Sequence, residues 1–352
     1  MQMRGAVIGA CAVAAAVLAA RPARAQERYT LEGERVAVYN LAGQVRVEAG
    51  SGSSVVVELT RGGEDARQLA VRRGEAGGFR NLAVAYPGDR VIYPAMGRTS
   101  STTVEVRSNG TFGGDRRLLG GGSRVTVRGS GSGTRAWADV RVLVPAGRTV
   151  AVHNAVGRVD VSNVRGDLRV NGYASSIHAT GTRGPLNLDT GSGGIEVTDA
   201  EGDIRLDTGS GGVRATNVRG AGLDIDTGSG GVQGTDLAVA RLHVDVGSGG
   251  VRLDAVDARI VDIDTGSGAV NLRLRRDADH VKIDTGSGGV TLAVPADFGA
   301  EADIDTGSGG IHVNVPAAVR RSARDHFTGT LGDGRGRLII DTGSGGVQIV
   351  RS

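Results

Sequence analysis

The feature that most constrains this 352-residue chain is a repeated corner, Asp-Thr-Gly-Ser-Gly-Gly followed by Val or Ile. Successive copies begin 18, 19, 19, 19, 20, 21 and 36 residues apart. Self-similarity at a short fixed period is typical of a solenoid, in which each copy forms one coil stacked on the last. Asp189, Asp207, Asp226, Asp284, Asp305 and Asp341 begin exact copies, and Asp245 and Asp264 begin near-copies with Val246 and Ala269 substituted.

Apolar and polar residues alternate on both sides of each corner. The first and third residues before the Asp are apolar in every copy, and the residue between them is polar in all but one. After the glycine pair, a Val or Ile opens a second alternating stretch. A period of two is typical of half-buried strands. The sequence therefore predicts an all-β fold, a parallel β-solenoid (β-helix) of about 18–20-residue coils that is right-handed by the usual crossover preference.

The corner residues are predicted to be structural. We expect the glycines to supply turn dihedrals that other residues reach only at a cost. Parallel coils stack about 4.8 Å apart, so the aspartates form a row whose bare carboxylates repel by roughly 1 kcal/mol in water. We expect each carboxylate to accept backbone N–H bonds from its own corner. The row comprises Asp189, Asp207, Asp226, Asp245, Asp264, Asp284, Asp305 and Asp341.

A row of bound cations such as calcium is the alternative. No second carboxylate column stands beside the first to complete a cage of six to eight oxygen ligands, so we predict no cofactor and no metal. A calcium titration that raises the melting temperature by many degrees would contradict this prediction.

Catalytic or phosphate-binding roles for these motifs have less support than a structural role. Asp-Thr-Gly-Ser resembles the aspartic-protease signature, but that chemistry needs two aspartates sharing one proton, and the repeat already explains the string. A phosphate loop needs Gly-Lys-Ser/Thr opening a helix, and Lys282, the only lysine, lies in a predicted strand. The six histidines are scattered with no i, i+4 pair, so we expect them to be solvated. No catalytic set emerges, and the chain is predicted not to be an enzyme.

Residues 1–25 are predicted to be an export signal, because a basic start and an apolar run precede a small-x-small cleavage site. The whole chain has 41 basic and 38 acidic residues, and this segment carries three arginines and no acid. The mature chain then has 38 of each, which argues against a nucleic-acid footprint. The only cysteine, Cys11, leaves with the signal. We expect an exported protein in the periplasm, at the cell surface or outside the cell, with no membrane span after cleavage.

The remaining chain divides into two predicted regions. Residues 26–138 form an irregular N-terminal β region with a Gly/Ser/Arg-rich insertion at about 88–138, predicted to be a hairpin or a poorly ordered loop. Residues 139–352 form the repeat domain. Asn154 and Asn171 precede Asp189 by the same step and are predicted to be degenerate first corners.

Two features of the C-terminal part lead to further expectations. Pro316 to Gly336 fills a gap of nearly two periods and is predicted to be either a coil with a decayed corner or a short helical excursion. The chain ends at Ser352 directly after the last strand. We expect an open sheet edge there, blunted only by Arg351.

The N-terminal pattern Val-x-Val-x-Asn-x-x-Gly-x-Val-x-Val at residues 36–47, followed by the Asp-Thr-Gly-Ser-Gly-Gly-Val coils, resembles a bacterial family of secreted β-strand-repeat proteins of unknown function that are often labelled adhesins. The resemblance covers about residues 30–350. It implies a β-solenoid at the cell surface or in the periplasm, and the family supplies no catalytic residues to transfer.

The favoured function is therefore a non-catalytic exported solenoid that acts as an adhesin or an envelope-surface interaction protein. Its expected ligand is an envelope or surface protein or polysaccharide. One alternative is a carbohydrate-active parallel β-helix enzyme, for which acids together with Arg or Lys in one groove would be the discriminating feature. Another is an envelope-stress or assembly factor, which locating the mature protein in cell fractions would separate from the others.

Overall fold

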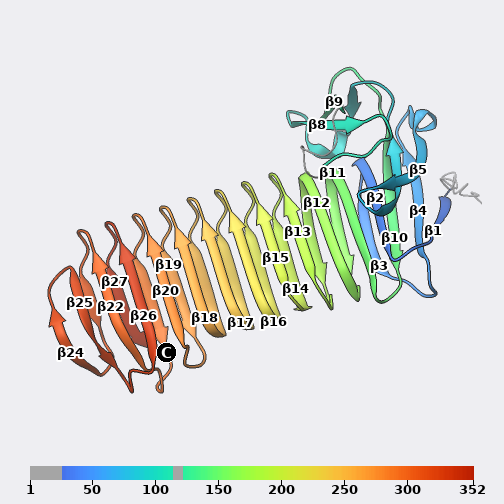
Figure 1. Cartoon of the computed structure of the whole chain (residues 1–352). Helices are drawn as coiled ribbons and strands as arrows, with labels where there is room; N and C mark the ends of the chain where they lie inside the picture. The colour runs from blue at the N-terminus through green and yellow to red at the C-terminus, as the bar shows by residue number, and fades with distance from the viewer. Residues whose placement is uncertain (1–25, 114–121) are drawn as a thin grey trace, which may run out of the picture.

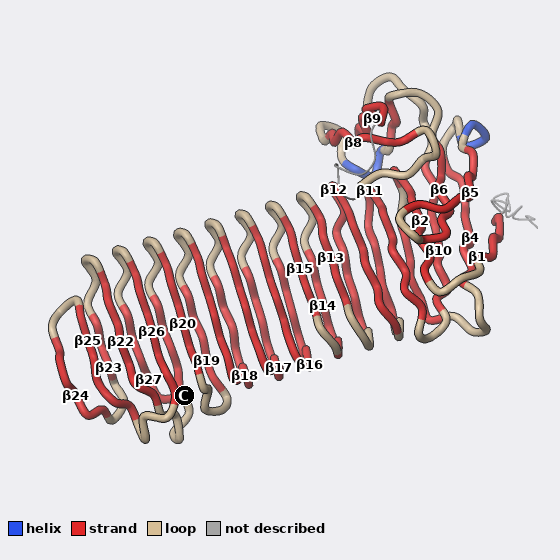
Figure 2. Tube along the Cα trace, viewed as in Figure 1, coloured by secondary structure: helices blue, strands red, loops and turns tan. Residues whose placement is uncertain are grey.

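The computed structural model describes residues 26–113 and 122–352, so the predicted signal segment lies outside the described residues, as does part of the insertion. The described chain is an elongated stack of β-coils with a small module over its N-terminal end (Figure 1). Turns gather along the edges of the stack, and the helix drawn is confined to short pieces near the N-terminal end (Figure 2).

The N-terminal strands are β1 (Gln26–Leu31), β2 (Arg35–Ala42), β3 (Val45–Ala49), β4 (Val55–Gly62), β5 (Ala70–Ala76) and β6 (Phe79–Ala85). The insertion holds β7 (Arg90–Ile92), β8 (Ser101–Arg107) and β9 (Gly122–Arg128). Two short 3-10 helices are η1 (Ala66–Gln68) and η2 (Pro94–Met96). After the insertion comes β10 (Trp137–Val144). The 15-residue strands are β11 (Arg148–Ser162), β12 (Gly166–Thr180), β16 (Val213–Thr227), β17 (Val232–Val246) and β18 (Val251–Thr265).

Shorter strands complete the stack: β13 (Leu186–Thr190), β14 (Ile195–Glu201), β15 (Ile204–Thr208), β19 (Val270–Leu274), β20 (His280–Thr285), β21 (Val290–Val294), β22 (Ala300–Thr306) and β23 (Ile311–Val313). The C-terminal strands are β24 (Ala317–Ser322), β25 (His326–Leu331), β26 (Gly336–Thr342) and β27 (Val347–Arg351).

Successive coils stack in parallel, as the period predicted. β13 pairs with β15 and β15 with β16, which places Leu188, Leu206 and Ile225 in one column. These three side chains are fully buried. Burying one aliphatic side chain stabilises the fold by about 1.5–3 kcal/mol, so the inward columns supply most of the cohesion between coils. The parallel β-solenoid is thus confirmed.

The corner glycines are needed for a reason different from the predicted one. None of the glycines in the described corners has a positive φ. A Cβ on Gly211 would instead lie 1.9 Å from the carbonyl oxygen of Gly193 in the preceding coil, and one on Gly230 would lie 1.8 Å from that of Gly211. The prediction of special dihedrals is wrong, because the coils approach too closely at this edge for any side chain.

The order of the last coils departs from the order of the chain. β26 pairs in parallel with both β20 and β22, and β27 pairs with both β21 and β23. The final coil is therefore inserted between two earlier ones. The prediction of an open edge at Arg351 is wrong, because β27, which ends at Arg351, lies between β21 and β23.

The segment between Pro316 and Gly336 is neither a decayed coil nor a helix. It forms β24 and β25, which pair antiparallel with each other, and β25 pairs antiparallel with β22. This hairpin covers the β22 side of the last parallel coil and leaves β24 as an outer strand with Arg320 and Arg321 on it. Charged residues on an outer strand discourage pairing with another chain.

The N-terminal end is also covered. β2 and β3 pair in parallel with β11, while β4 and β5 add antiparallel strands through β10 and β6. In the insertion, β9 lies between β7 and β8 in a separate three-stranded sheet. A second apolar cluster joins that sheet to the outer face of the first coils, through Tyr39, Phe112 and Ala151 among others.

Candidate functional site

The aspartate row exists as a single file on the outer face. Strand register places Asp189, Asp207 and Asp226 side by side, and the same register continues through the stack. After Asp284 the file runs to Asp341 and ends at Asp305, following the inserted coil. The carboxylates point outward, and they lie one per coil.

Threonine, not aspartate, closes the corners. Thr227 Oγ1 donates to the carbonyl of Gly211 in the preceding coil at 3.0 Å and accepts from the Gly230 N–H at 3.1 Å. The same pair of bonds recurs at Thr208, where the distances are 2.8 and 3.1 Å. Over residues 26–113 and 122–352, the carboxylates of the row accept no N–H from their own corners. The expectation that they do is therefore wrong, since the buried Thr hydroxyl occupies that place.

The structure separates Asn154 and Asn171, which the sequence placed together in the aspartate column. His153, Asn171 and Asp189 are in register, so Asn171 stands in the aspartate column. Asn154 stands one residue further on, in the buried threonine column. Its amide donates to the Gly43 carbonyl and accepts from Asn40, so it acts as an inward tie between coils. The prediction that Asn154 is an aspartate-type corner is wrong by one residue, and one residue reverses the face.

The carboxylates in the file influence one another. Burial raises the pKa of Asp189 above its ordinary value, and the neighbouring Asp207 carboxylate raises it further, while Arg205 opposes both. This is the repulsion expected of stacked carboxylates.

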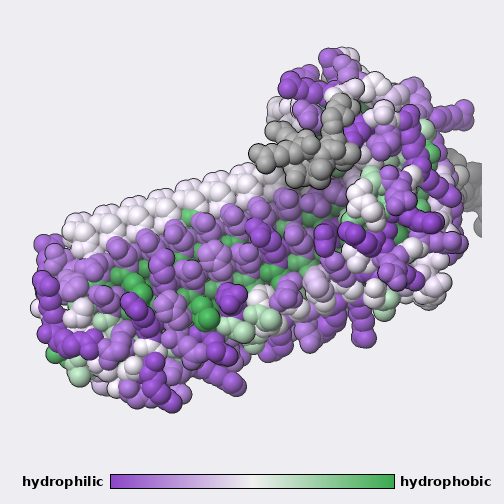
Figure 3. Space-filling model, viewed as in Figure 1, coloured by the Kyte–Doolittle hydropathy of each residue, from purple (hydrophilic) through white to green (hydrophobic). Residues whose placement is uncertain are grey.

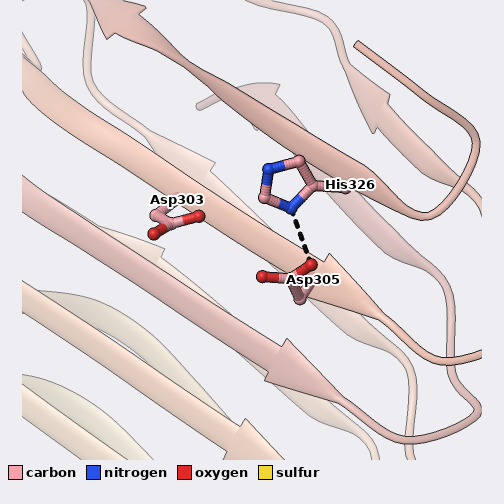
Figure 4. A group of neighbouring side chains, drawn as sticks. All are labelled: Asp303, Asp305 and His326. Carbon is pink, nitrogen blue, oxygen red and sulfur yellow. Dashed lines mark hydrogen bonds and ion pairs between the residues drawn. The ribbon is translucent and has the colours of Figure 1, made fainter. Parts of the chain in front are cut away.

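At the end of the file, Asp303, Asp305 and His326 form the group with metal-ligating chemistry in the described part of the chain. One ligand atom from each lies within 4.8 Å of the others. Asp303 and Asp305 project from the same side of β22, and His326 reaches them from β25 (Figure 4). His326 Nδ1 and Asp305 Oδ1 are 2.6 Å apart.

Two carboxylates and one imidazole suit a divalent transition ion such as zinc better than calcium, which prefers an all-oxygen shell. From the sequence, we expected all six histidines to be solvated. The sequence does not reveal this group, because His326 reaches the two aspartates only through the antiparallel pairing of β25 with β22. Without an ion, the hydrogen bond between His326 and Asp305 joins the hairpin of β24 and β25 to the last parallel coil.

A depression of about 1020 Å³ lies along the outer face of β12, β13, β15, β16 and β17; it is called the outer groove below. Hydrophilic side chains cover most of the face visible in Figure 3, below a pale band that follows one edge of the stack. Polar and charged residues dominate the walls of the outer groove: Asp167, Arg169, Asn187, Asp203, Arg205, Asp224, Arg241 and His243.

Some of these groups neutralise one another. Arg169 lies 3.1 Å from Asp167, and Arg205 lies 3.6 Å from Asp224. Asp203 and Arg241 make no ion pair with any described residue. The outer groove therefore offers both donors and acceptors to a partner, together with one acid and one base that are not already engaged.

In the described part of the chain, no helix is long and apolar enough to span a membrane. Stacked parallel coils with a repeated corner and a polar outer face define a β-solenoid built from sequence repeats. The family model Toastrack DUF4097 matches residues 140–350, and the chain belongs to this family of unknown function.

Two chains among the solved structures also match. One is described as the "crystal structure of a putative cell adhesion protein from Clostridium sporogenes", at 10% identity and a TM-score of 0.20, with 93% of this chain and 99% of that chain covered. At that TM-score the likeness carries no argument about this chain. No curated protein matches.

Proposed function

We propose that this protein is an exported, non-catalytic binding protein that uses its solenoid to hold a ligand of the cell envelope or cell surface, as an adhesin does. The observation that carries the proposal is the outer groove, which runs across successive coils with alternating acids, arginines and amides. A rigid stack keeps such groups at a fixed spacing, which suits an extended ligand with a repeat of its own. The signal-like residues 1–25 support export.

The test is cosedimentation of the purified chain with isolated envelope polysaccharide and, separately, with envelope protein. Arg241→Gln removes the unpaired base of the outer groove and should weaken binding to the true ligand. Arg252→Gln is the matched control, because Arg252 is an exposed residue of β18 that does not line the groove. Equal binding by both variants to every fraction would refute the proposal. Fractionation of cells tests the location independently.

One observation favours a second candidate. Acids and arginines share the outer groove, as expected of a carbohydrate-active β-helix enzyme, and Asp203 makes no ion pair with any described residue. Release of new reducing ends from envelope polysaccharide, lost in Asp203→Asn, would establish that activity. Binding without product formation would leave the binding function as the conclusion.

A further inference from the structure

In the first three coils, residues other than aspartate occupy the aspartate column. Tyr39, His153 and Asn171 occupy it in three successive coils, in register with Asp189. The insertion packs over this part of the outer face and leaves a cavity of about 460 Å³ at its margin. That volume falls within the range of about 300–1,000 Å³ typical of small-ligand sites.

The described lining of the cavity is positively charged. Its described lining includes Arg107 and Arg169 and no acidic residue. Arg169 is paired with Asp167 outside the cavity, whereas among the described residues Arg107 bonds only neutral oxygens, Thr111 Oγ1 at 3.4 Å and the Gly113 carbonyl at 3.0 Å. These two bonds position the guanidinium, and neither partner neutralises its charge. A guanidinium favours a carboxylate, which it can bind through two parallel N–H bonds.

The wall beside Arg107 is aromatic and contains an unsatisfied polar atom. The rings of Tyr39 and His153 stack with centroids 4.3 Å apart and an interplanar angle of 5°, and Phe112 meets both edge-on. His153 Nδ1 is buried and has no hydrogen-bond partner among the described residues. A Cβ on Gly113 would lie 3.3 Å from this nitrogen, so the glycine keeps the space beside it open.

Burial, aided by the charge of Arg107, lowers the pKa of His153 to about 4. The imidazole is therefore neutral at pH 7 and offers one N–H and one lone pair. A buried polar atom without a partner is rare in folded proteins, and a ligand hydroxyl would satisfy it.

The cavity adjoins the outer groove, because Arg169 and Asn187 line both. We propose that the cavity binds a carboxylate-bearing sugar ring, with the carboxylate on Arg107 and hydroxyls on Asn171 and His153. The sugar is a terminal residue of an acidic polysaccharide whose following residues lie along the groove. This inference rests on the proposed binding function and specifies its ligand class.

The test is calorimetric titration of the whole chain with glucuronate, with short glucuronate-containing oligosaccharides, with glucose and with acetate. Glucose should bind about tenfold more weakly or worse, because it lacks the charge-assisted hydrogen bonds. Arg107→Gln should show a similar loss for glucuronate, and the control Arg252→Gln should not. Among the six histidine ring signals in NMR spectra, that of His153 should shift on addition of glucuronate.

Acetate binding as tightly as glucuronate, or unchanged glucuronate binding by Arg107→Gln, would overturn the proposal. His153→Phe provides a second variant that preserves ring stacking; it should weaken glucuronate binding and remove the shifting signal, and failure to do either counts against the proposal. If affinity rises with oligosaccharide length in the wild type but not in Arg241→Gln, the ligand is the end of a polysaccharide. Equal affinity for all lengths would instead identify a free acidic sugar as the ligand. Polysaccharide binding lost in Arg241→Gln but kept in Arg107→Gln would refute the cavity and leave the groove function standing.

Discussion

The threonine ladder gives the sharpest test of how the coils are held in register. Thr227 is fully buried, and its hydroxyl joins the Gly211 carbonyl of one coil to the Gly230 N–H of the next. Thr227→Val keeps the shape and removes both bonds. Each net hydrogen bond contributes about 1 kcal/mol, and a partner left buried and unsatisfied costs about 1–3 kcal/mol, so the expected loss is about 2 kcal/mol.

The loss should be local, because each coil contacts only its neighbours. Amide hydrogen exchange at Gly230 should accelerate about 30-fold for a 2 kcal/mol loss, and urea denaturation should shift to lower concentration. Thr235→Val is the matched control, since Thr235 is an exposed residue on the outer side of β17 with no side-chain hydrogen bond in the described structure. The next coil provides the reverse experiment, because Val246 stands in the threonine column. Val246→Thr should gain about 1 kcal/mol. A Thr227→Val variant within about 0.5 kcal/mol of wild type, the range of ordinary surface changes, would refute the reasoning.

Three further predictions follow from the same contacts. Gly230→Ala should unfold its coil or cost several kcal/mol because its Cβ would lie 1.8 Å from a backbone oxygen, whereas Gly231→Ala, with its nearest atom at 3.3 Å, should be tolerated; circular-dichroism melting of the two variants compares them. The pKa of Asp189 is raised in the fold, so the folded state holds that proton more tightly and the carboxylate costs stability as pH rises through its unfolded pKa. Asp189→Asn should therefore raise the melting temperature at pH 7 and lose that advantage below about pH 4, and a gain that persists in acid would contradict the cause given. Deleting residues 332–352 should expose residues 300–331 to rapid hydrogen exchange, because the final coil joins them to the stack; protection that survives the deletion would contradict the inserted order.

The outer face shows why only part of the candidate site was predictable. The aspartate file follows from the period, because strands in register bring equal positions of successive coils together. The cavity does not follow, because Tyr39, Arg107 and His153 come from three distant segments and meet only when the insertion packs over the first coils. In isolation, His153 has the same alternating neighbours as any outward residue.

The sequence by itself determined the coil, its two strand faces and its tight corner, because strand periodicity and nearest-neighbour stacking are local properties that each copy repeats. It did not determine the order of the last coils. Those beginning at Asp305 and Asp341 carry the same corner, so either could stack on the coil of Asp284. The tertiary structure decided this order. Only the coil beginning at Asp305 continues into the hairpin of β24 and β25, and this hairpin pairs antiparallel along the outer side of β22, so that coil lies at the end of the parallel stack.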